Sequence, residues 1–355
     1  MQSLIYPTPQ SRTCESCFFV STPYHVLLSH IIASGELSKG KSILVMKEKR
    51  EKFFDMFASI RNDKNTPFEE VLFLKQPATG KLNKGSKLIK RRAQEAGELI
   101  KKLRPEKIYI FNDTYLDQFL AYIGKRFQAT IYYVEDGAIA YSTHKIRVSH
   151  WTQFKNRFIY GNFFHEVETE GTSPNIDYVL AAYPGHVRKE FPPHKLIELP
   201  KARESIFRKL SWPKTFLSSL KIPETSFKYD SLYVLGYSGL FKHIENYPSA
   251  LSCIVKSTVN ANFNSAVKYH PREKQSDYLS LGSLGLKVIH QSVPAEILYY
   301  LNNNNLKFIY GDIGTSLITA RWFLPNCRVI SFMEHVGIED QPFKNLLCQI
   351  GVELA

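Results

Sequence analysis

The chain has 355 residues, 44% of them hydrophobic, and its aromatic residues comprise 20 Tyr, 24 Phe and 3 Trp. This length fits two domains of the usual size or one large domain, and the composition excludes a disordered chain or a small disulfide-stapled module. The net charge of +13, from 46 Lys and Arg against 33 Asp and Glu, favours anionic partners such as nucleotides, acidic glycans, nucleic acid or an anionic membrane surface.

Short apolar runs alternate with amphipathic stretches in the first part of the chain, which is the pattern of βαβ units on a parallel sheet. Pro23 lies where the first turn of a helix tolerates proline. The expected strands are 17–21, 42–46, 71–74, 107–111 and 130–134, and the expected helices lie near 48–60, 86–103 and 116–126. Together they predict a first, Rossmann-like domain.

The stretch 141–226 has weaker periodicity and several prolines, which indicate loops, short strands and a linker. A second alternating series follows, with strands expected at 231–235, 265–269, 287–289, 307–310 and 328–332, and helices beginning near Pro248, Arg272, Pro294 and Thr315. We therefore expect an α/β protein with Rossmann-like domains at 1–205 and 231–355, joined by a linker at 206–230. Two such domains leave a central cleft between the carboxyl ends of their strands, where open α/β sheets bind ligands.

Five cysteines include one C-x-x-C pair, Cys14 and Cys17. An odd number without regular spacing indicates no disulfide framework, so we expect a reducing compartment. The pair fits a redox site or half of a zinc site, but no second pair follows to complete a zinc cluster. We expect no metal, and we expect Cys17 to begin a buried strand.

The first fifteen residues lack a basic segment followed by a long apolar stretch, and no window holds about 18 uninterrupted apolar residues. We therefore expect a cytoplasmic protein, either in solution or peripheral at the inner face of the cell membrane. One segment, 81–92, is strongly basic, with Lys81, Lys84, Lys87, Lys90, Arg91 and Arg92. Such a run is typical of a solvated helix face or of a contact for an anionic membrane or an acidic glycan.

Two adjacent carboxylates, Glu135 and Asp136, directly follow the expected strand 130–134, and Gly137 lets the chain turn there. Adjacent strand residues point in opposite directions, so one carboxylate can face the cleft while the other supports the loop. A cleft carboxylate near other negative charge suits general-base catalysis, because its pKa rises toward neutrality. An ordinary acidic turn at the end of a strand is the alternative.

A second polar cluster, Lys268, His270 and Pro271, lies at the end of the expected strand 265–269. Pro271 fits the first turn of a helix, whose free backbone N–H groups would bind phosphate together with the neighbouring His270 and Lys268. A purely structural histidine is the alternative.

Two further helix starts in the second domain carry polar groups. Glu296 follows Pro294 and Ala295, and its carboxylate either accepts hydrogen bonds from ribose hydroxyls or complements the helix dipole. Thr315 and Ser316 follow a glycine-containing turn, where their hydroxyls either cap the helix or bind phosphate.

The order of these motifs resembles the bacterial sialyltransferases, which have a GT-B fold. Those enzymes share a D/E-D/E-G motif, an H-P motif and a serine or threonine pair nearer the carboxyl terminus. Here E-D-G stands at 135–137, H-P at 270–271, P-A-E at 294–296 and the hydroxyl pair at 315–316. The opening F-F-V-S-T-P-Y-H at 18–25 also resembles the lipooligosaccharide sialyltransferase and capsule polysialyltransferase groups.

The resemblance, which spans most of the chain, implies an inverting glycosyltransferase. It would move sialic acid from CMP-sialic acid to a glycan hydroxyl of a bacterial surface polysaccharide or lipooligosaccharide. The first domain would bind the acceptor and the second the CMP-sugar donor. No cofactor or metal is expected, since helix amides, a histidine and hydroxyls can stabilise a single phosphate leaving group.

Individual roles follow from the same resemblance. Glu135 would be the general base that deprotonates the acceptor hydroxyl, and Asp136 would support it. His270 would bind the phosphate of CMP and assist its departure, and Glu296 would hold the ribose or cytosine end. The implied donor contacts are Lys268, His270, Pro271, Glu296, Thr315 and Ser316.

Other functions fit parts of the sequence. A relative that uses another CMP-activated ulosonic acid, such as legionaminic or pseudaminic acid, fits as well, because the same basic cleft could accept the carboxylate of that donor. A nucleic-acid-binding protein fits the charge and the aromatic content, with 81–92 contacting phosphates. The special residues lie at strand ends facing one cleft, however, so we expect no nucleic-acid partner. A non-catalytic glycan-binding relative would be expected to lose Glu135 or His270, and both are present.

Overall fold

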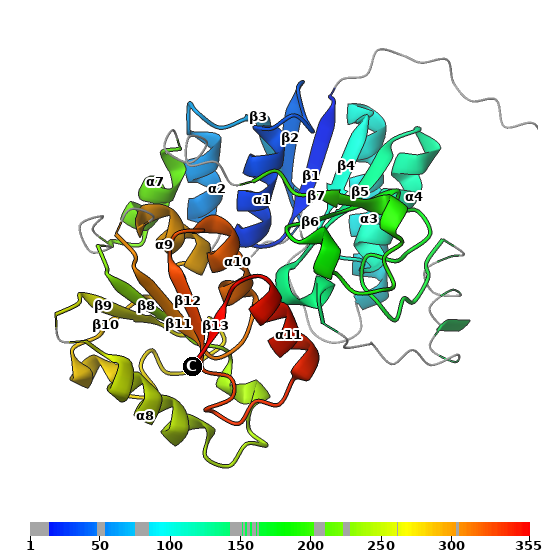
Figure 1. Ribbon diagram of the computed structural model, residues 1–355. Coiled ribbons are helices and arrows are strands. Elements are labelled where there is room, and N and C mark those ends of the chain that lie inside the picture. Colours follow the sequence, from blue (N-terminus) through cyan, green and yellow to red (C-terminus); the bar gives the residue numbers. More distant parts are fainter. Residues whose placement is uncertain are drawn as a thin grey trace, which may run out of the picture.

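The computed structural model describes residues 14–47, 54–74, 85–142, 151, 153–154, 157, 161, 163–201, 210–222, 228–260, 262–302 and 305–355, except the side chains of 54 and 85–92. Two parallel sheets, each accompanied by helices, form the molecule (Figure 1). The strands of the first sheet fall within 16–198 and those of the second within 231–354. The expected α/β class with two Rossmann-like sheets is confirmed.

The first sheet has seven strands in the order β3-β2-β1-β4-β5-β6-β7. The strands are β1 (Ser16–Val20), β2 (Ser42–Met46), β3 (Phe68–Phe73), β4 (Lys107–Ile110), β5 (Thr130–Val134), β6 (Tyr178–Ala181) and β7 (Leu196–Glu198). Its helices are α1 (Pro23–Ala33), α2 (Phe54–Arg61), α3 (Gly85–Leu103) and α4 (Tyr115–Arg126), with the 3₁₀ helices η2 (Gly137–Ala140), η3 (Pro184–His186) and η4 (Pro193–Lys195). The strand order reverses between β1 and β4, which is where such sheets bind ligands.

The second sheet has six strands in the order β10-β9-β8-β11-β12-β13. They are β8 (Ser231–Val234), β9 (Ser265–Lys268), β10 (Lys287–Val288), β11 (Phe308–Gly311), β12 (Arg328–Ser331) and β13 (Glu353–Leu354). The accompanying helices are α8 (Tyr247–Thr258), α9 (Ala295–Asn302), α10 (Thr315–Phe323) and α11 (Gln341–Gln349), with 3₁₀ helices η6 (Ser238–Leu240) and η7 (Leu281–Leu284). Here the order reverses between β8 and β11.

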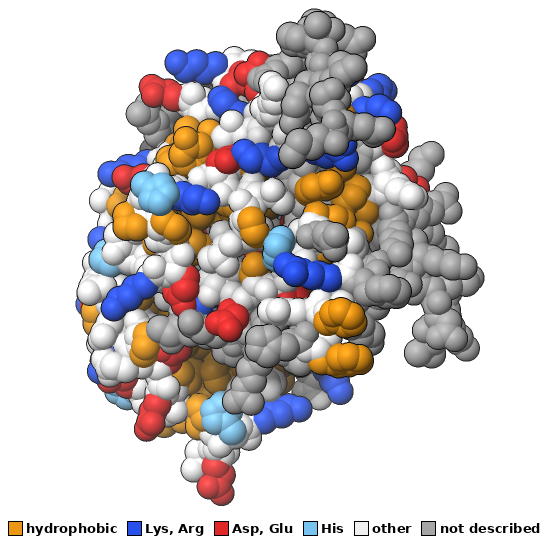
Figure 2. All heavy atoms as spheres, turned by 90° about the vertical axis from the view of Figure 1, so that its right-hand side faces the viewer, with side chains coloured by type: hydrophobic (Ala, Val, Ile, Leu, Met, Phe, Trp, Pro, Cys, Tyr) orange, Lys and Arg blue, Asp and Glu red, His pale blue; other side chains and the backbone are white. Residues whose placement is uncertain are grey.

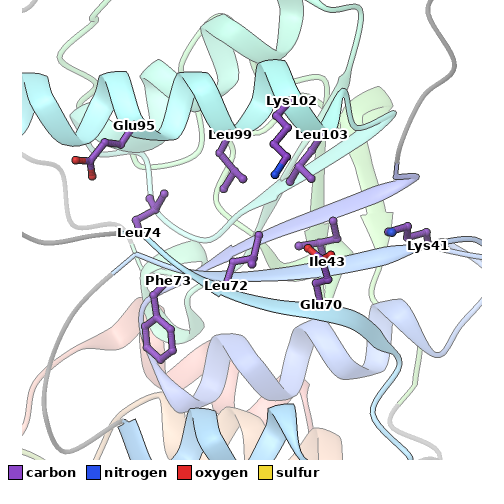
Figure 3. A pocket seen from close by; sticks show the side chains of 10 residues that line it. All are labelled: Lys41, Ile43, Glu70, Leu72, Phe73, Leu74, Glu95, Leu99, Lys102 and Leu103. Carbon is purple, nitrogen blue, oxygen red and sulfur yellow. The ribbon is translucent and has the colours of Figure 1, made fainter.

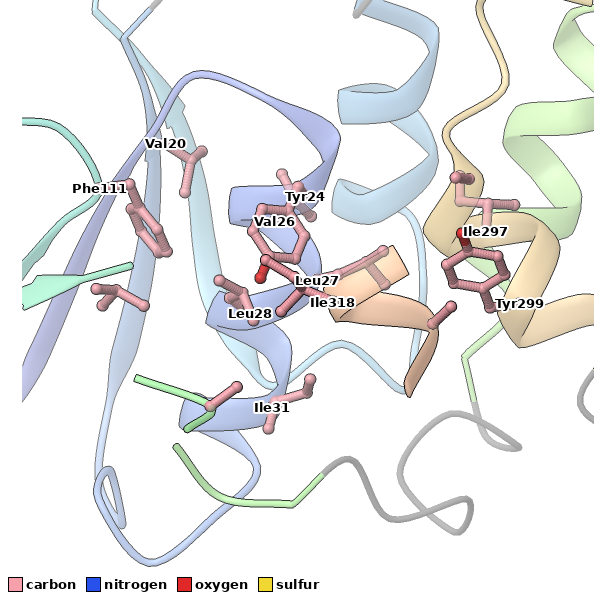
Figure 4. Packing of buried hydrophobic residues seen from close by; sticks show 14 of the residues in the cluster. Val20, Tyr24, Val26, Leu27, Leu28, Ile31, Phe111, Ile297, Tyr299 and Ile318 are labelled. Atoms are coloured by element: carbon pink, nitrogen blue, oxygen red, sulfur yellow. The ribbon is translucent and has the colours of Figure 1, made fainter. Parts of the chain in front are cut away.

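Helix α1 begins at a strong sequence signal and is buried along nearly its whole length. The Thr22 hydroxyl accepts the His25 N–H at 3.2 Å, and Pro23 takes the first helical position, where its missing N–H costs nothing. Ten of its eleven residues are buried. Figure 4 shows side chains of α1 with Ile318 of α10, and all belong to one continuous apolar cluster that includes both domains.

Aromatic rings stack across each sheet from strand to strand. In the first sheet, Tyr109 lies between Phe18 (ring centroids 4.4 Å apart) and Tyr132 (4.9 Å). In the second, Tyr233 stacks on Tyr310 at 4.8 Å. Such aromatic pairs contribute about 0.5–1.5 kcal/mol each beyond the apolar area they bury. These ladders fix the strand register and hence the positions of the strand ends.

Most of the predicted elements are present, with ends that differ by a few residues. The strands expected at 42–46 and 130–134 agree at both ends with β2 and β5. Of the helix expected near 48–60, residues 48–53 lie outside the described part, and the remainder is α2. Among the α-helices and strands, those that the sequence did not specify are β6, β7, α7 (Trp212–Ser219), α11 and β13.

The helix expected to begin near Arg272 is absent from the described residues 272–280, which form turns. Two side chains in this stretch bind backbone groups that helical geometry would not present to them. The Glu273 carboxylate accepts the Ser238 N–H at 2.7 Å, and Asp277 accepts the N–H groups of Leu281 and Gly282, each at 2.9 Å. Pro271 therefore does not open a helix, and the expected phosphate-binding helix end at this position is wrong.

The stretch expected as a linker, 206–230, contains helix α7, which contacts α2 of the first domain. Asp63 anchors the start of α7 by accepting the N–H groups of Ser211 and Trp212, both at 2.7 Å. His30 of α1 lies against Trp212, with ring centroids 5.6 Å apart. The chain therefore returns to the first domain before it enters the second sheet.

Cys14 and Cys17 are both free and buried at the start of β1. Burial raises the pKa of Cys14 to about 12 and that of Cys17 well above its usual value. Thiolate chemistry at neutral pH is therefore disfavoured for this pair. Across the described ranges, no group of three or more His, Cys, Asp and Glu residues is arranged to hold a metal ion. None of the described helices has the length and apolarity required to span a membrane.

Candidate active site

A cavity of about 230 Å³ lies between the two domains and is lined by residues of both. Thr22, Pro23 and Tyr24, from the turn after β1 and the first turn of α1, line it from the first domain. The second domain contributes five of the predicted donor residues: Lys268, His270, Pro271, Glu296 and Ser316. The carboxyl ends of β1 and β9 therefore face the same space, as the sequence predicts for a cleft between two Rossmann-like sheets.

Glu135, at the end of β5, is completely buried. One carboxylate oxygen accepts the Tyr24 hydroxyl at 3.3 Å, and the other accepts the Ala182 N–H at 3.0 Å and the Tyr141 hydroxyl. Burial raises the pKa of Glu135 to about 7, although these hydrogen bonds stabilise its ionised form. The carboxylate thus titrates near neutral pH, as a general base requires.

Asp136 has the opposite environment, with 27% of its side chain exposed. One oxygen lies 3.0 Å from Nε2 of His25, and Asn112 donates to the other at 3.2 Å. Burial by itself raises the pKa of Asp136, but His25, Lys47 and Asn112 outweigh it and hold the pKa below its usual value. Asp136 is therefore ionised beside a carboxyl that is half protonated at neutral pH.

The His25 ring is fixed on both of its nitrogens. The Ser21 N–H donates to Nδ1 at 3.2 Å, so that nitrogen carries no proton, and Nε2–H is left to donate to Asp136. The ring also stacks on Phe111 with centroids 4.6 Å apart, and none of it is exposed. These contacts hold the Asp136 carboxylate in one orientation.

The two domains touch where the E-D-G motif, which ends at Gly137, meets Thr315 of the hydroxyl pair. The Ala138 N–H donates to Oγ1 of Thr315 at 3.0 Å, and η2 contacts the start of α10. Thr315 is not among the residues that line the cavity, whereas the neighbouring Ser316 is. The hydroxyl pair predicted to bind phosphate is therefore divided, with one member at the domain contact and the other at the cavity.

His270, which follows β9, lies against Tyr237 and lines the cavity. The Arg272 N–H donates to its Nδ1 at 3.1 Å, so a neutral ring carries its proton on Nε2. Burial, followed by the charges of Arg272 and Lys268, lowers the pKa of His270 to about 4. Without a bound anion, His270 is thus a neutral hydrogen-bond donor.

Two charged side chains complete the second-domain wall. Lys268 is buried, and its ammonium donates to the carbonyls of Tyr269 at 2.6 Å and Gln291 at 3.2 Å, so it brings positive charge while it holds the loop. Glu296 lies in the first turn of α9, and burial raises its pKa above the usual range. Both positions agree with the expected places at the cleft.

A fully buried carboxylate, Asp312, ties the second-domain loops together. It accepts the N–H of Gly236 at 2.8 Å, the N–H of Ile313 at 2.8 Å and the Tyr247 hydroxyl. These donors come from the loop after β8, the turn before α10, and α8. Asp312 thereby fixes the turn that carries Thr315 and Ser316.

A larger cavity, of about 610 Å³, lies between α3 and strands β2 and β3 of the first domain (Figure 3). Leu72, Leu74 and Leu99 give it an aliphatic lining, edged by Lys and Glu side chains. None of the motif residues lines it, so we place the candidate active site in the smaller cavity between the domains.

The predicted basic segment 81–92 falls partly outside the description. Residues 81–84 are not among the described residues, and 85–92 begin α3 without described side chains. On the face that lies to the right in Figure 1, the described Lys and Arg side chains are interspersed with Asp and Glu (Figure 2). The membrane or glycan contact assigned to this segment stays a prediction.

Tyr24, His25 and Asn112 are site residues to which the sequence analysis gave no role. Asn112 follows β4, which pairs with β5. Tyr24 and His25 follow β1, which lies on the other side of β4. Carboxyl ends of parallel strands meet at one edge. Applied to the polar residues after β1 and β4, that rule predicts that they lie beside the E-D-G motif.

Two parallel-stranded domains that face one cleft constitute the GT-B fold of glycosyltransferases. The chain is similar to an α/β-galactoside α-2,3-sialyltransferase of Photobacterium phosphoreum, with a TM-score of 0.56 and 10% identity over 97% of this chain and 99% of that one. It is also similar to a putative UDP-N-acetylglucosamine 2-epimerase of Listeria monocytogenes, with a TM-score of 0.51 and 12% identity over 91% and 79% of the two chains. At these identities the likeness establishes the fold alone.

The family follows from the sequence. The model of the alpha-2,8-polysialyltransferase (POLYST) family matches residues 16–333. The chain therefore belongs to this family and is a sialyltransferase. No curated protein matches its sequence significantly. The expected resemblance to bacterial sialyltransferases with a GT-B fold is confirmed.

Proposed function

We propose that this sialyltransferase takes sialic acid from CMP-sialic acid and transfers it, with inversion, to a hydroxyl of a glycan acceptor. One observation carries the proposal. The cavity between the domains is lined by His270 and Ser316 on one side and by Tyr24, hydrogen-bonded to Glu135, on the other. Groups suited to a leaving phosphate thus face a carboxylate suited to activating a hydroxyl.

The donor would bind mainly to the second domain. Neutral His270 donates Nε2–H to the phosphate, and Ser316 adds a hydroxyl at the start of α10, where the helix dipole favours negative charge. The buried charge of Lys268 attracts the same anion. Glu296 accepts hydrogen bonds from the ribose or cytosine, and Thr315 reaches the phosphate only when its bond to Ala138 opens.

Glu135 would be the general base. Its pKa of about 7 makes it ionised in a large fraction of molecules at neutral pH while it is still basic enough to take a proton. Asp136 supports it, because the Asp136 charge contributes to the raised pKa of Glu135. His25 and Asn112 keep that supporting charge in place.

The arrangement favours a single displacement. The acidic pair belongs to the first domain and the phosphate-binding groups to the second. The acceptor would therefore attack the anomeric carbon from the side opposite the departing CMP, which inverts its configuration. Phosphate stabilisation by a histidine, a hydroxyl and backbone amides needs no metal, so we expect transfer to persist in EDTA.

The acceptor is proposed from the family and from the charge. The family is described as alpha-2,8-polysialyltransferases, so we propose an acceptor that itself ends in sialic acid, on a bacterial surface polysaccharide or lipooligosaccharide. A net charge of +13 suits such a polyanion.

A donor panel tests the proposal. CMP-sialic acid, CMP-legionaminic acid and CMP-pseudaminic acid are each incubated with the enzyme, with and without oligosaccharides that end in sialic acid or galactose. CMP release and the linkage of the product are measured. Acceptor-dependent CMP release from CMP-sialic acid is expected. Release from another CMP-sugar alone would change the donor, and no release from any CMP-sugar would reject the function.

Two matched histidine variants test the phosphate site. His270→Ala is expected to lower both CMP affinity and kcat, since the imidazole contacts the phosphate before and during its departure. His290 is the control, because it follows β10 as His270 follows β9 and accepts the N–H of Ser292 at 3.2 Å, yet it does not line the cavity. His290→Ala is expected to retain CMP affinity in calorimetry, and equal losses in both variants would return His270 to a structural role.

A further inference from the structure

Glu135, the proposed general base, has no exposed surface through which a substrate can reach it. The carboxylate is fully buried, and hydrogen-bond donors from the protein occupy both of its oxygens. An acceptor hydroxyl therefore cannot hand its proton to Glu135 directly in the described arrangement. Some group that contacts both Glu135 and the cavity has to carry the proton.

Tyr24 is such a group. Its hydroxyl donates to Oε1 of Glu135 at 3.3 Å, and the same side chain lines the cavity that His270 and Ser316 line from the other domain. Its position is fixed, because it lies in the first turn of α1, directly after the Thr22 cap and Pro23. Figure 4 shows Tyr24 among the packed side chains of α1.

Tyr141, the other phenol that donates to Glu135, does not reach the cavity between the domains. The Tyr141 hydroxyl donates to Oε2 and also accepts the Tyr183 N–H at 3.2 Å, so it is held by the protein on two sides. Tyr141 does not line the cavity between the domains. Of these two phenols, Tyr24 alone connects the carboxylate to the proposed donor site.

We propose that Tyr24 relays the acceptor proton to Glu135, an inference that rests on the proposed function. The acceptor hydroxyl donates a hydrogen bond to the Tyr24 oxygen. As the acceptor oxygen forms its bond to the anomeric carbon and the bond from that carbon to the CMP phosphate breaks, its proton passes to the Tyr24 oxygen. The original phenol proton passes to Oε1 of Glu135, so the products are the glycoside, CMP, neutral Tyr24 and protonated Glu135.

The surroundings of Tyr24 suit a group that passes a proton on without keeping a charge. Burial and the nearby carboxylates Glu135, Glu296 and Asp136 raise the pKa of Tyr24 well above its usual value. Tyr24 therefore does not become a lasting phenolate, and the negative charge stays on Glu135 until the acceptor proton arrives. Burial behind a phenol also keeps water away from the base.

The experiment compares Tyr24→Phe with Tyr141→Phe, Glu135→Gln and the double variant Tyr24→Phe/Glu135→Gln. The phenylalanine variants remove only a hydroxyl, and Glu135→Gln replaces the carboxylate with an amide of nearly the same size. For each, kcat with a sialylated acceptor is measured from pH 6 to 9, CMP affinity by calorimetry, and folding by thermal unfolding. Tyr24→Met, which also lacks the hydroxyl, replaces Tyr24→Phe if the latter does not fold.

The relay predicts different pH dependences for the two phenols. Tyr24→Phe should lose about 10²-fold or more in kcat, within the usual contribution of proton transfer, and the loss should remain at pH 9, where Glu135 is ionised. Tyr141→Phe removes a hydrogen bond that lowers the pKa of Glu135, so its loss should be largest at low pH and shrink as the pH rises. The double variant should be no slower than Glu135→Gln, because both changes interrupt one path.

The outcomes separate the relay from the proposed function. A kcat for Tyr24→Phe within about 3-fold of the wild type at pH 9, or losses that multiply in the double variant, would overturn the relay while Glu135→Gln still fails. Normal turnover of Glu135→Gln would remove the base assignment itself. CMP affinity retained in Tyr24→Phe shows that a loss of kcat does not come from a lost donor site.

Discussion

Thr315 fills the space above Gly137 where any other residue would carry its β-carbon. A β-carbon at position 137 would lie 2.0 Å from Cγ2 of Thr315, and Gly137 has a φ of +66°. The glycine of the E-D-G motif is thus required twice, once by its backbone conformation and once by the neighbouring domain. It lets the acidic loop of the first domain touch the hydroxyl pair of the second.

Gly137→Ala is therefore expected to damage both stability and activity. The methyl group has to displace Thr315 or move the acidic loop, and overpacking of this kind costs about 1–3 kcal/mol. The left-handed backbone conformation adds strain for alanine. Thermal unfolding should show a lower midpoint, and kcat should fall because Glu135 and Asp136 shift relative to the donor site.

Gly185→Ala is the matched control. A β-carbon at Gly185 meets no atom within 4 Å, and its φ is not positive. This variant is expected to keep the stability and the rate of the wild type. Equal behaviour of the two alanine variants would mean that the contact between Gly137 and Thr315 does not constrain the enzyme.

His25→Leu is expected to reduce kcat by about 10- to 100-fold, since small misplacements of catalytic groups have effects of this size. The variant removes the Nε2–H that orients Asp136 and helps to keep it ionised. KM for the donor should change little, because His25 does not line the cavity. His25→Gln, whose amide can donate in place of Nε2–H, should recover part of the rate.

His30→Leu is the control on the same helix. His30 is also completely buried, but its Nδ1 lies 2.9 Å from the Val26 carbonyl and its Nε2 has no hydrogen-bond partner. The substitution removes a buried polar atom without a partner, so stability should be kept and kcat should not change. If His30→Leu and His25→Leu lose rate alike, the effect belongs to packing of α1 rather than to the bond with Asp136.

The acid limb of the rate profile should report Glu135. Burial raises the pKa of its carboxyl to about 7, and the base acts only when ionised. kcat/KM should therefore fall about tenfold per pH unit below pH 7 and level off above it, because kcat/KM follows the free enzyme. His270, whose pKa is lowered to about 4, stays neutral throughout this range. A limb below pH 5 would instead assign the base to Asp136, whose pKa is lowered.

The basic segment yields a separate prediction. Replacing Lys84, Lys87, Lys90 and Arg91 with glutamine should weaken binding to vesicles that contain anionic lipid, or to a long polysialylated acceptor. Each basic residue near an anionic surface contributes about 1 kcal/mol, and salt screens the attraction. Turnover on a short soluble acceptor should persist, because no motif residue lies in the segment.

Four exposed lysines of the second domain form a charge-matched control, namely Lys242, Lys256, Lys274 and Lys287. Their replacement by glutamine changes the net charge by the same amount at another place. If both sets weaken vesicle flotation equally at low salt, total charge rather than the segment 81–92 is responsible. If neither does, the segment is an ordinary solvated helix face.

The fold could be predicted because the strands of a parallel sheet buried on both faces are continuous apolar runs in the sequence. β1 and β2 are continuous apolar runs, and Pro23 marks the helix that follows β1. The apolar pattern of β6 and β7 is weaker, because these strands have only four and three residues and prolines lie between them. The turn structure at 272–280 could not be predicted, because Glu273 and Asp277 act on backbone groups whose positions depend on the folded structure.

The site could be predicted motif by motif, but the pairing of the motifs could not. Glu135 and Asp136 follow β5 in an obvious way, whereas their partners Tyr24 and His25 lie 111 residues earlier. Both pairs form because only β4 separates β1 from β5 in the sheet. The assignment of Thr315 to the domain contact likewise depends on how the two domains meet, which no local pattern specifies.

The size of the cavity between the domains bears on the order of events in turnover. Its volume of about 230 Å³ lies below the roughly 300–1,000 Å³ of sites that hold small molecules. A nucleotide-sugar would therefore have to widen it, and the bond between Thr315 and Ala138 is one of the contacts between the domains that widening would break. Donor affinity is then reduced by the rarity of the open form. A variant that lacks this bond, such as Thr315→Val, would open more often and bind CMP faster, although it also lacks the hydroxyl that reaches the phosphate in the open form.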